Sequence, residues 1–98
     1  MKVDLGNYKY CETDELEEIG KINNQVMHGT QIKINGTLFK TEKENYIFYG
    51  RIYDMDRGID LGRKWKLLDK LKYKDYLSLC DTVMNSENKW NLLGYEKV

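Results

Sequence analysis

The dipeptide Asn35-Gly36 lies between two short stretches in which apolar and polar residues alternate. Ile32 and Ile34 precede it, and Leu38 follows it. Asn-Gly favours the type I′ turn, whose twist matches that of two paired antiparallel strands. The pattern therefore predicts a β-hairpin with its turn at residues 35–36.

A longer strand is predicted over residues 46–53, where apolar residues again recur at every second position. One face of this strand receives Tyr46, Phe48 and Ile52. The opposite face receives Ile47, Tyr49, Arg51 and Tyr53. A polar turn at 41–45 joins the strand to the hairpin, so that three antiparallel strands form a meander.

Two helices are predicted on either side of the meander. The first covers residues 14–28, where Asp14 can cap the helix and apolar residues recur at helical spacing. The second covers residues 73–85. Residues 63–74 fit a strand and a helix equally well, and 90–95 fit a short closing strand or an extended tail. We expect one α+β domain over 1–98, with an antiparallel three- to five-stranded sheet and two helices packed on one of its faces.

The chain has few side chains of the kind that catalyse reactions. Its 98 residues include one histidine, two serines and two cysteines. Nucleophile–base pairs and metal sites built on imidazole or thiolate need more than this. We therefore expect a protein that is not an enzyme and has no cofactor or metal. His28 is expected at the end of the first helix, beside its last carbonyls.

The N-terminal residues contain no apolar segment typical of a signal peptide, and no apolar run reaches the length of a membrane span. The sequence thus predicts a cytoplasmic protein without membrane contact. Cys11 and Cys80 are then expected as reduced thiols, although their spacing also permits a disulfide. Asp54, Asp56 and Asp60 fit a turn that uses Asp and Gly for its backbone, with loose binding of a cation as the alternative.

Amphipathic side chains on the second face of strand 46–53 are the best candidates for a binding surface. Tyrosine and arginine are the residues favoured at interface hot spots, and we assign the partner-binding role to Tyr49, Arg51 and Tyr53. The function expected is a small regulatory module that binds another protein by occupying its surface. Oligomeric state stays open.

The composition also bears on origin. Alanine and proline are absent, and lysine outnumbers arginine 13 to 3. These are the preferences of AT-rich codons, so we expect a low-GC bacterium or its phage or mobile element. Small proteins of such elements include inhibitors of host defence complexes, which is one form that the predicted protein binding would take.

Nucleic-acid binding through the basic segment Arg63–Lys74 is the alternative function. Six cations alternate there with two aromatic residues, and single strands are held by phosphate neutralisation together with base stacking. The residues concerned are Arg63, Lys64, Trp65, Lys66, Lys70, Lys72, Tyr73 and Lys74. The formal net charge of zero and the absence of a glycine-rich phosphate loop weigh against it.

Overall fold

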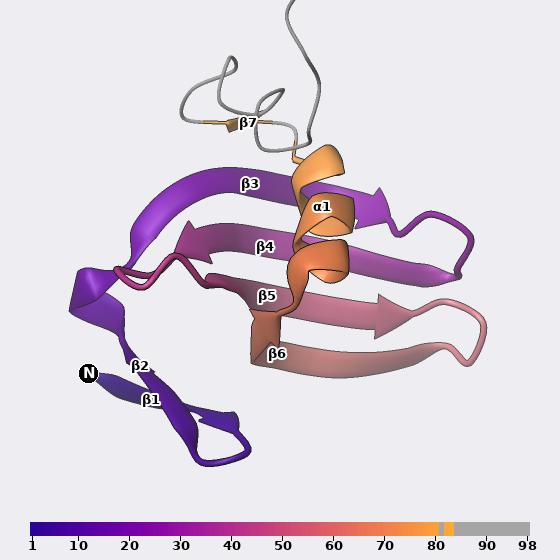
Figure 1. The fold of residues 1–98 in the computed structure, drawn as a ribbon. Coiled ribbons are helices and arrows are strands. Elements are labelled where there is room, and N and C mark those ends of the chain that lie inside the picture. Colours follow the sequence, from indigo (N-terminus) through magenta and orange to yellow (C-terminus); the bar gives the residue numbers. More distant parts are fainter. Residues whose placement is uncertain (81, 84–98) are drawn as a thin grey trace, which may run out of the picture.

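The computed structural model describes residues 1–80 and 82–83 (Figure 1). A hairpin of two strands comes first, followed by a single 3₁₀ turn at Thr13–Glu15. The remaining elements form the main body of the fold. In chain order, the elements are β1 (Lys2–Gly6), β2 (Lys9–Glu12), β3 (Glu17–Val26), β4 (Ile32–Lys40), β5 (Tyr46–Asp54), β6 (Ile59–Leu68), α1 (Lys70–Ser78) and β7 (Thr82–Val83).

Strands β3 to β6 pair with their neighbours in the order of the chain and form an antiparallel meander. The short β7 pairs with the outer side of β3, so the described sheet has the order β6-β5-β4-β3-β7. β1 and β2 make a separate two-stranded sheet. The helix α1 crosses one face of the meander (Figure 1). We call that face the helix face and the opposite one the open face.

The prediction of an α+β domain with two helices on a sheet is wrong. The described chain is mostly β, and it contains one short helix. Residues 14–28, predicted as a helix, form the 3₁₀ turn and β3 instead. Two irregularities in the pairing of β3, between Glu18 and Gly20 and between Ile22 and Gln25, explain the error. Because a β-bulge adds one residue to a strand, the strand's apolar spacing lengthens and resembles that of a helix.

The predicted turn at Asn35-Gly36 is also wrong, because both residues lie inside β4. Gly36 pairs with Gly50 on β5, and the ring of Phe48 lies against both glycines. A Cβ atom on Gly36 would lie 2.6 Å from the Cα of Gly50. Glycine is therefore required here by close packing of two strands, not by a turn, and this is a known use of glycine within strands. The chain reverses instead at 27–31 and 41–45.

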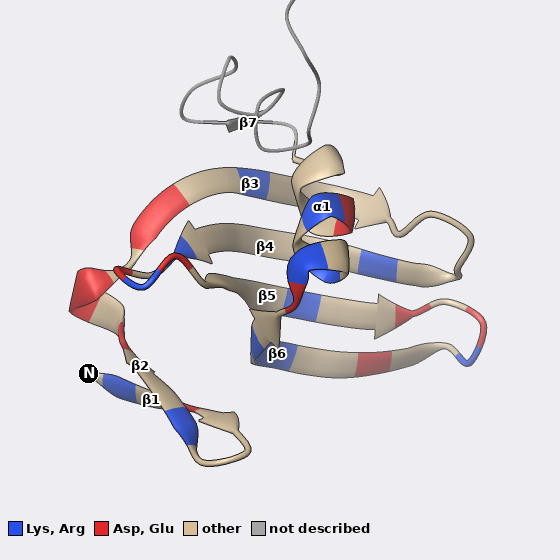
Figure 2. Cartoon of the chain, in the orientation of Figure 1, with Lys and Arg blue, Asp and Glu red and all other residues tan. Residues whose placement is uncertain are grey.

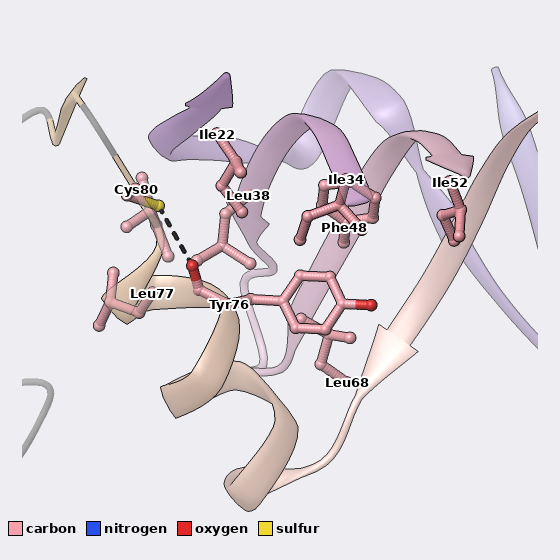
Figure 3. Close-up of a cluster of buried hydrophobic side chains, with 10 residues drawn as sticks. Ile22, Ile34, Leu38, Phe48, Ile52, Leu68, Tyr76, Leu77 and Cys80 are labelled. Atoms are coloured by element: carbon pink, nitrogen blue, oxygen red, sulfur yellow. Dashed lines mark hydrogen bonds between the residues drawn. The ribbon is translucent and has the colours of Figure 1, made fainter. Parts of the chain in front are cut away.

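β5 covers the strand predicted over 46–53, and its helix face carries Phe48 and Ile52, both buried. Buried side chains from four strands meet α1 there (Figure 3). The helix contributes Tyr76 and Leu77, and the Tyr76 ring lies 5.0 Å from that of Phe48, centroid to centroid. The cluster comprises Ile19, Ile22, Ile34, Leu38, Phe48, Ile52, Leu68, Tyr76, Leu77 and Cys80.

The ambiguous segment 63–74 is divided between two elements. It remains strand up to Leu68 and becomes helix at Lys70. Asp69 lies between the strand and the helix and is the N-cap of the helix. Its carboxylate accepts a hydrogen bond from the backbone N–H of Lys72 at 2.8 Å. The helix predicted over 73–85 thus begins earlier and ends at Ser78. Residues 81 and 84–85 of that prediction, and the strand predicted at 90–95, lie outside the described residues.

Stability is expected to fall as the pH rises above about 9. Burial raises the pKa of the Cys11 thiol above 9.0 and the pKa of the Tyr46 and Tyr76 phenols above 10.0. The unfolded chain therefore releases these protons first, and folding loses free energy as the pH passes through the raised values. Replacing Tyr76 by phenylalanine keeps the ring and removes one such group. Urea titrations between pH 7 and pH 10.5 should show a shallower decline in this variant, and an identical decline would contradict the assignment.

Candidate functional site: the open face of the sheet

The open face collects the side chains that alternate with the core residues along β4, β5 and β6. The cross-strand register places Thr37, Tyr49 and Trp65 in one row, and the next row holds Asn35, Arg51 and Arg63. Side chains of one row project from the same face of an antiparallel sheet. α1 contributes nothing to this face, because its buried residues pack on the other side.

The hairpin β1–β2 covers one end of the open face. Ile47 projects there and is nevertheless fully buried. A cavity of about 430 Å³ separates the hairpin from the sheet, and its lining includes Leu5, Cys11, Ile47 and Leu67. Cys11 is itself buried. The hairpin therefore lies over the Ile47 end of the open face with this cavity between them, and no described element covers the rows beyond Ile47.

Three aromatic rings cluster on the open face. The rings of Tyr49 and Trp65 stack with centroids 4.3 Å apart and an interplanar angle of 28°. Phe39 and Trp65 are 6.1 Å apart at 27°. Each ring is half-buried, and offset stacks of this kind contribute about 1 kcal/mol beyond the area that they bury. The stack is thus a fixed apolar platform beside the polar row.

A hollow of about 280 Å³ lies beside the aromatic cluster. Backbone atoms of Gly36 and Gly50 take part in its lining, and side chains from three strands complete it. Those residues are Asn35, Thr37, Tyr49, Arg51 and Arg63. The hollow thus lies over the backbone of the paired glycines, between the side chains of the two polar and aromatic rows.

The two arginines of the hollow face each other across β5 and β6. Arg51 Nη1 lies 3.8 Å from a carboxylate oxygen of Asp60, and both side chains are about half exposed. An exposed pair of this kind contributes little to stability. Arg63 makes no ion pair with any residue in the described part of the chain. The hollow is therefore positively charged.

The three residues predicted as partner-binding lie together on the open face. Tyr49 and Tyr53 are half-buried, and Arg51 is exposed. The prediction missed Asn35, Thr37 and Phe39, because a turn was assigned where β4 continues. The alternation of Lys33, Asn35, Thr37 and Phe39 with Ile32, Ile34, Gly36 and Leu38 was the signal that could have revealed them.

The residues predicted as nucleic-acid-binding do not share one surface. Arg63 and Trp65 lie on the open face, whereas Lys64 and Lys66 alternate with them and project from the helix face. Lys70, Lys72 and Lys74 belong to α1 (Figure 2). Tyr73 stacks on Tyr46 at 4.2 Å within the helix-face packing.

Three of these lysines do come together. Partial burial lowers the pKa of Lys66, and the charges of Lys72 and Lys64 lower it further. Two lysines of β6 and one of α1 thus form a group of cations that repel one another. We call Lys64, Lys66 and Lys72 the lysine cluster.

In the acidic turn after β5, aspartate carboxylates accept hydrogen bonds from backbone N–H groups of the same turn. The Asp54 carboxylate accepts hydrogen bonds from the backbone N–H groups of Asp56 and Arg57, and the Asp60 carboxylate accepts one from Gly62. Side chains of this length commonly stabilise turns in this way. Within residues 1–80 and 82–83, no group of three or more His, Cys, Asp or Glu side chains is arranged to hold a metal ion.

His28 and the two cysteines also have defined positions. His28 is exposed in the turn between β3 and β4, so the prediction that it ends a helix is wrong. Cys11 and Cys80 are both buried. The Cys80 thiol lies 3.6 Å from the backbone carbonyl of Tyr76, to which it donates a weak hydrogen bond.

Comparisons with protein-family models, curated proteins and solved structures gave no match. In the part of the chain that the structure describes, no helix combines the length and the apolar character needed for a membrane crossing. Function is therefore inferred from the geometry and chemistry of the open face.

Proposed function

We propose that the chain is a non-enzymatic regulatory module that binds another protein through the open face of its sheet. The observation that carries this proposal is the position of Tyr49, Arg51 and Tyr53 together on the open face of the four-stranded meander, where Arg51 is exposed and both tyrosines are half-buried. Tyrosine and arginine dominate interface hot spots, because they offer a large contact area together with polar groups. A partner would cover the platform without any further element of this chain having to move.

The aromatic arrangement favours a protein over a single-stranded nucleic acid. Bases stack on the free faces of aromatic rings. Here Tyr49 and Trp65 stack on each other, and Phe39 lies beside Trp65. The ring faces that pack against one another here cannot also stack on bases. The ring edges and the tyrosine hydroxyls can still contact a protein surface.

The proposal includes a cellular setting. The excess of lysine over arginine and the lack of alanine and proline support an origin in a low-GC bacterium or in its phage or mobile element. In the cytoplasm of such a host, occupation of a partner's surface would inhibit that partner. A host defence complex is the class of target that we favour.

Capture from a low-GC host lysate tests the proposal. Immobilised protein should retain a discrete host protein, equally before and after nuclease treatment. The variant Tyr49→Ala/Arg51→Ala/Tyr53→Ala should bind it at least about tenfold more weakly, since each hot-spot side chain contributes more than about 1 kcal/mol. A matched triple variant on the exposed side of α1, Lys70→Ala/Leu71→Ala/Lys74→Ala, should bind normally.

Two results would overturn this assignment. Undiminished capture by the open-face variant, with its thermal unfolding unchanged, would place the binding surface elsewhere. Capture that disappears after nuclease treatment would favour nucleic acid as the ligand.

The lysine cluster supports nucleic-acid binding as a second candidate function. Lys64 and Lys66 project from the helix face of β6, and Lys72 belongs to the helix that follows, so bound phosphate groups would offset the repulsion among the three cations. This candidate predicts an affinity for nucleic acid that falls steeply with salt and is lost in Lys64→Gln/Lys66→Gln/Lys72→Gln. The open-face variant would then bind as the wild type does.

A further inference from the structure

We propose that the hollow of the open face receives a carboxylate group from an acidic side chain of the protein partner. This inference rests on the proposed function, and it adds the chemistry by which the partner is recognised. The hollow is lined by Asn35, Thr37, Tyr49, Arg51 and Arg63, with the backbone of Gly36 and Gly50 contributing to it.

The pairing of two arginines is the first observation. Arg51 and Arg63 are directly opposite each other on neighbouring strands. Like charges in this position destabilise a sheet. The carboxylate of Asp60 lies 3.8 Å from Arg51, but Arg63 has no such partner among the described residues. A further carboxylate placed between the two guanidinium groups would offset this repulsion.

The chemistry of the other lining groups is the second observation. Asn35 pairs with Arg51 and Thr37 with Tyr49 on the adjacent strand, so an amide and a hydroxyl border the arginines. These side chains donate hydrogen bonds to a carboxylate, and arginine binds carboxylates in a bidentate fashion. The backbone of Gly36 and Gly50 forms part of the hollow's lining, so an acidic side chain that enters it comes close to the sheet.

The charge of the surrounding face is the third observation. The register adds Lys21 and Lys33 to the open face, which makes four cations with the two arginines. Two carboxylates share the face, Glu18 at 3.9 Å from Lys21 and Asp60 beside Arg51. The balance of four cations and two anions favours an acidic partner surface. The adjacent aromatic cluster favours one that also presents apolar side chains.

Titration with a minimal probe tests the inference. The ¹⁵N-labelled full chain is titrated in phosphate-free buffer at low salt with N-acetyl-glutamate-N′-methylamide, and separately with the glutamine analogue. Only the glutamate probe should shift the backbone resonances of Asn35, Thr37, Arg51 and Arg63. Arg63→Gln should weaken its binding about tenfold or more, because a charged hydrogen-bonding group is lost. The matched variant Arg57→Gln, at an exposed arginine in the turn after β5, should bind as the wild type does.

Other results would overturn the inference. Equal shifts with the glutamine probe, shifts located outside the hollow, or no shifts at all would exclude carboxylate recognition there. A response to inorganic phosphate without a response to the glutamate probe would identify a phosphate site instead. Any of these results would leave the proposed open-face binding standing if Tyr49→Ala/Arg51→Ala/Tyr53→Ala still loses the captured protein. A bound glutamate probe together with undiminished capture by that variant would overturn only the proposed function.

Discussion

Replacing Gly50 by alanine is expected to destabilise the folded protein strongly. A Cβ atom at this position would overlap the carbonyl oxygen of Asn35 and lie 2.6 Å from the Cα of Gly36. It would also lie 2.7 Å from a ring carbon of Phe48, which is fully buried. The neighbouring atoms are backbone and packed core, so they cannot yield without separating β4 from β5. We expect a loss of about 3 kcal/mol or more in the free energy of unfolding.

Gly58→Ala is the matched control for this prediction. Gly58 lies in the turn after β5, where an added Cβ would meet no atom within 4 Å. Its φ of +64° gives alanine a penalty of about 1–2 kcal/mol, without any steric clash. Urea unfolding followed by circular dichroism measures both variants. A Gly50→Ala protein as stable as Gly58→Ala would contradict the close pairing of the two glycines.

Replacing Leu77 by alanine is expected to reduce the free energy of unfolding by about 2–5 kcal/mol. Leu77 has no solvent-exposed area and attaches α1 to the helix face together with Tyr76 (Figure 3). Truncation removes its buried methyl groups and leaves a cavity between the helix and the sheet. The helix has nine residues and depends on such contacts, because isolated helices of this length are marginal in water.

Leu71→Ala provides the comparison on the same helix. Leu71 is 78% exposed, so its truncation should change stability by no more than about 0.5 kcal/mol. The same leucine-to-alanine change is thus expected to cost much stability at the buried Leu77 and little at the exposed Leu71. Equal effects at both positions would show that α1 does not pack on the sheet through Leu77.

Residues 46–53 illustrate how much of the fold the sequence could predict. The two-residue alternation there assigned the strand and its buried face, because β5 pairs regularly along most of its length. The same alternation placed Tyr49, Arg51 and Tyr53 on one surface. The second helix was predicted from Tyr76, Leu77 and Cys80, which are buried in the structure. Where the spacing of apolar residues follows a regular strand or helix, the sequence thus predicts which side chains are buried.

Other features could not be found in this way, because they depend on contacts distant in sequence. The bulged strand β3 has apolar spacing that resembles a helix, and only its pairing with β4 reveals the bulges. Gly36 resembles a turn residue until Gly50 and Phe48 are known to pack against it. Residues 63–74 form one basic segment in sequence, yet β6 distributes its side chains over two faces of the sheet.

Site-specific photo-crosslinking tests the open face as a protein-binding surface most directly. Benzoylphenylalanine is introduced at Tyr53, on the open face, or at Leu71, on the exposed side of α1, and each protein is irradiated in nuclease-treated lysate of a low-GC host. We expect one host protein to be crosslinked from position 53 and not from position 71. Crosslinking of that protein from position 71 alone would contradict the account and place the partner on the helix side.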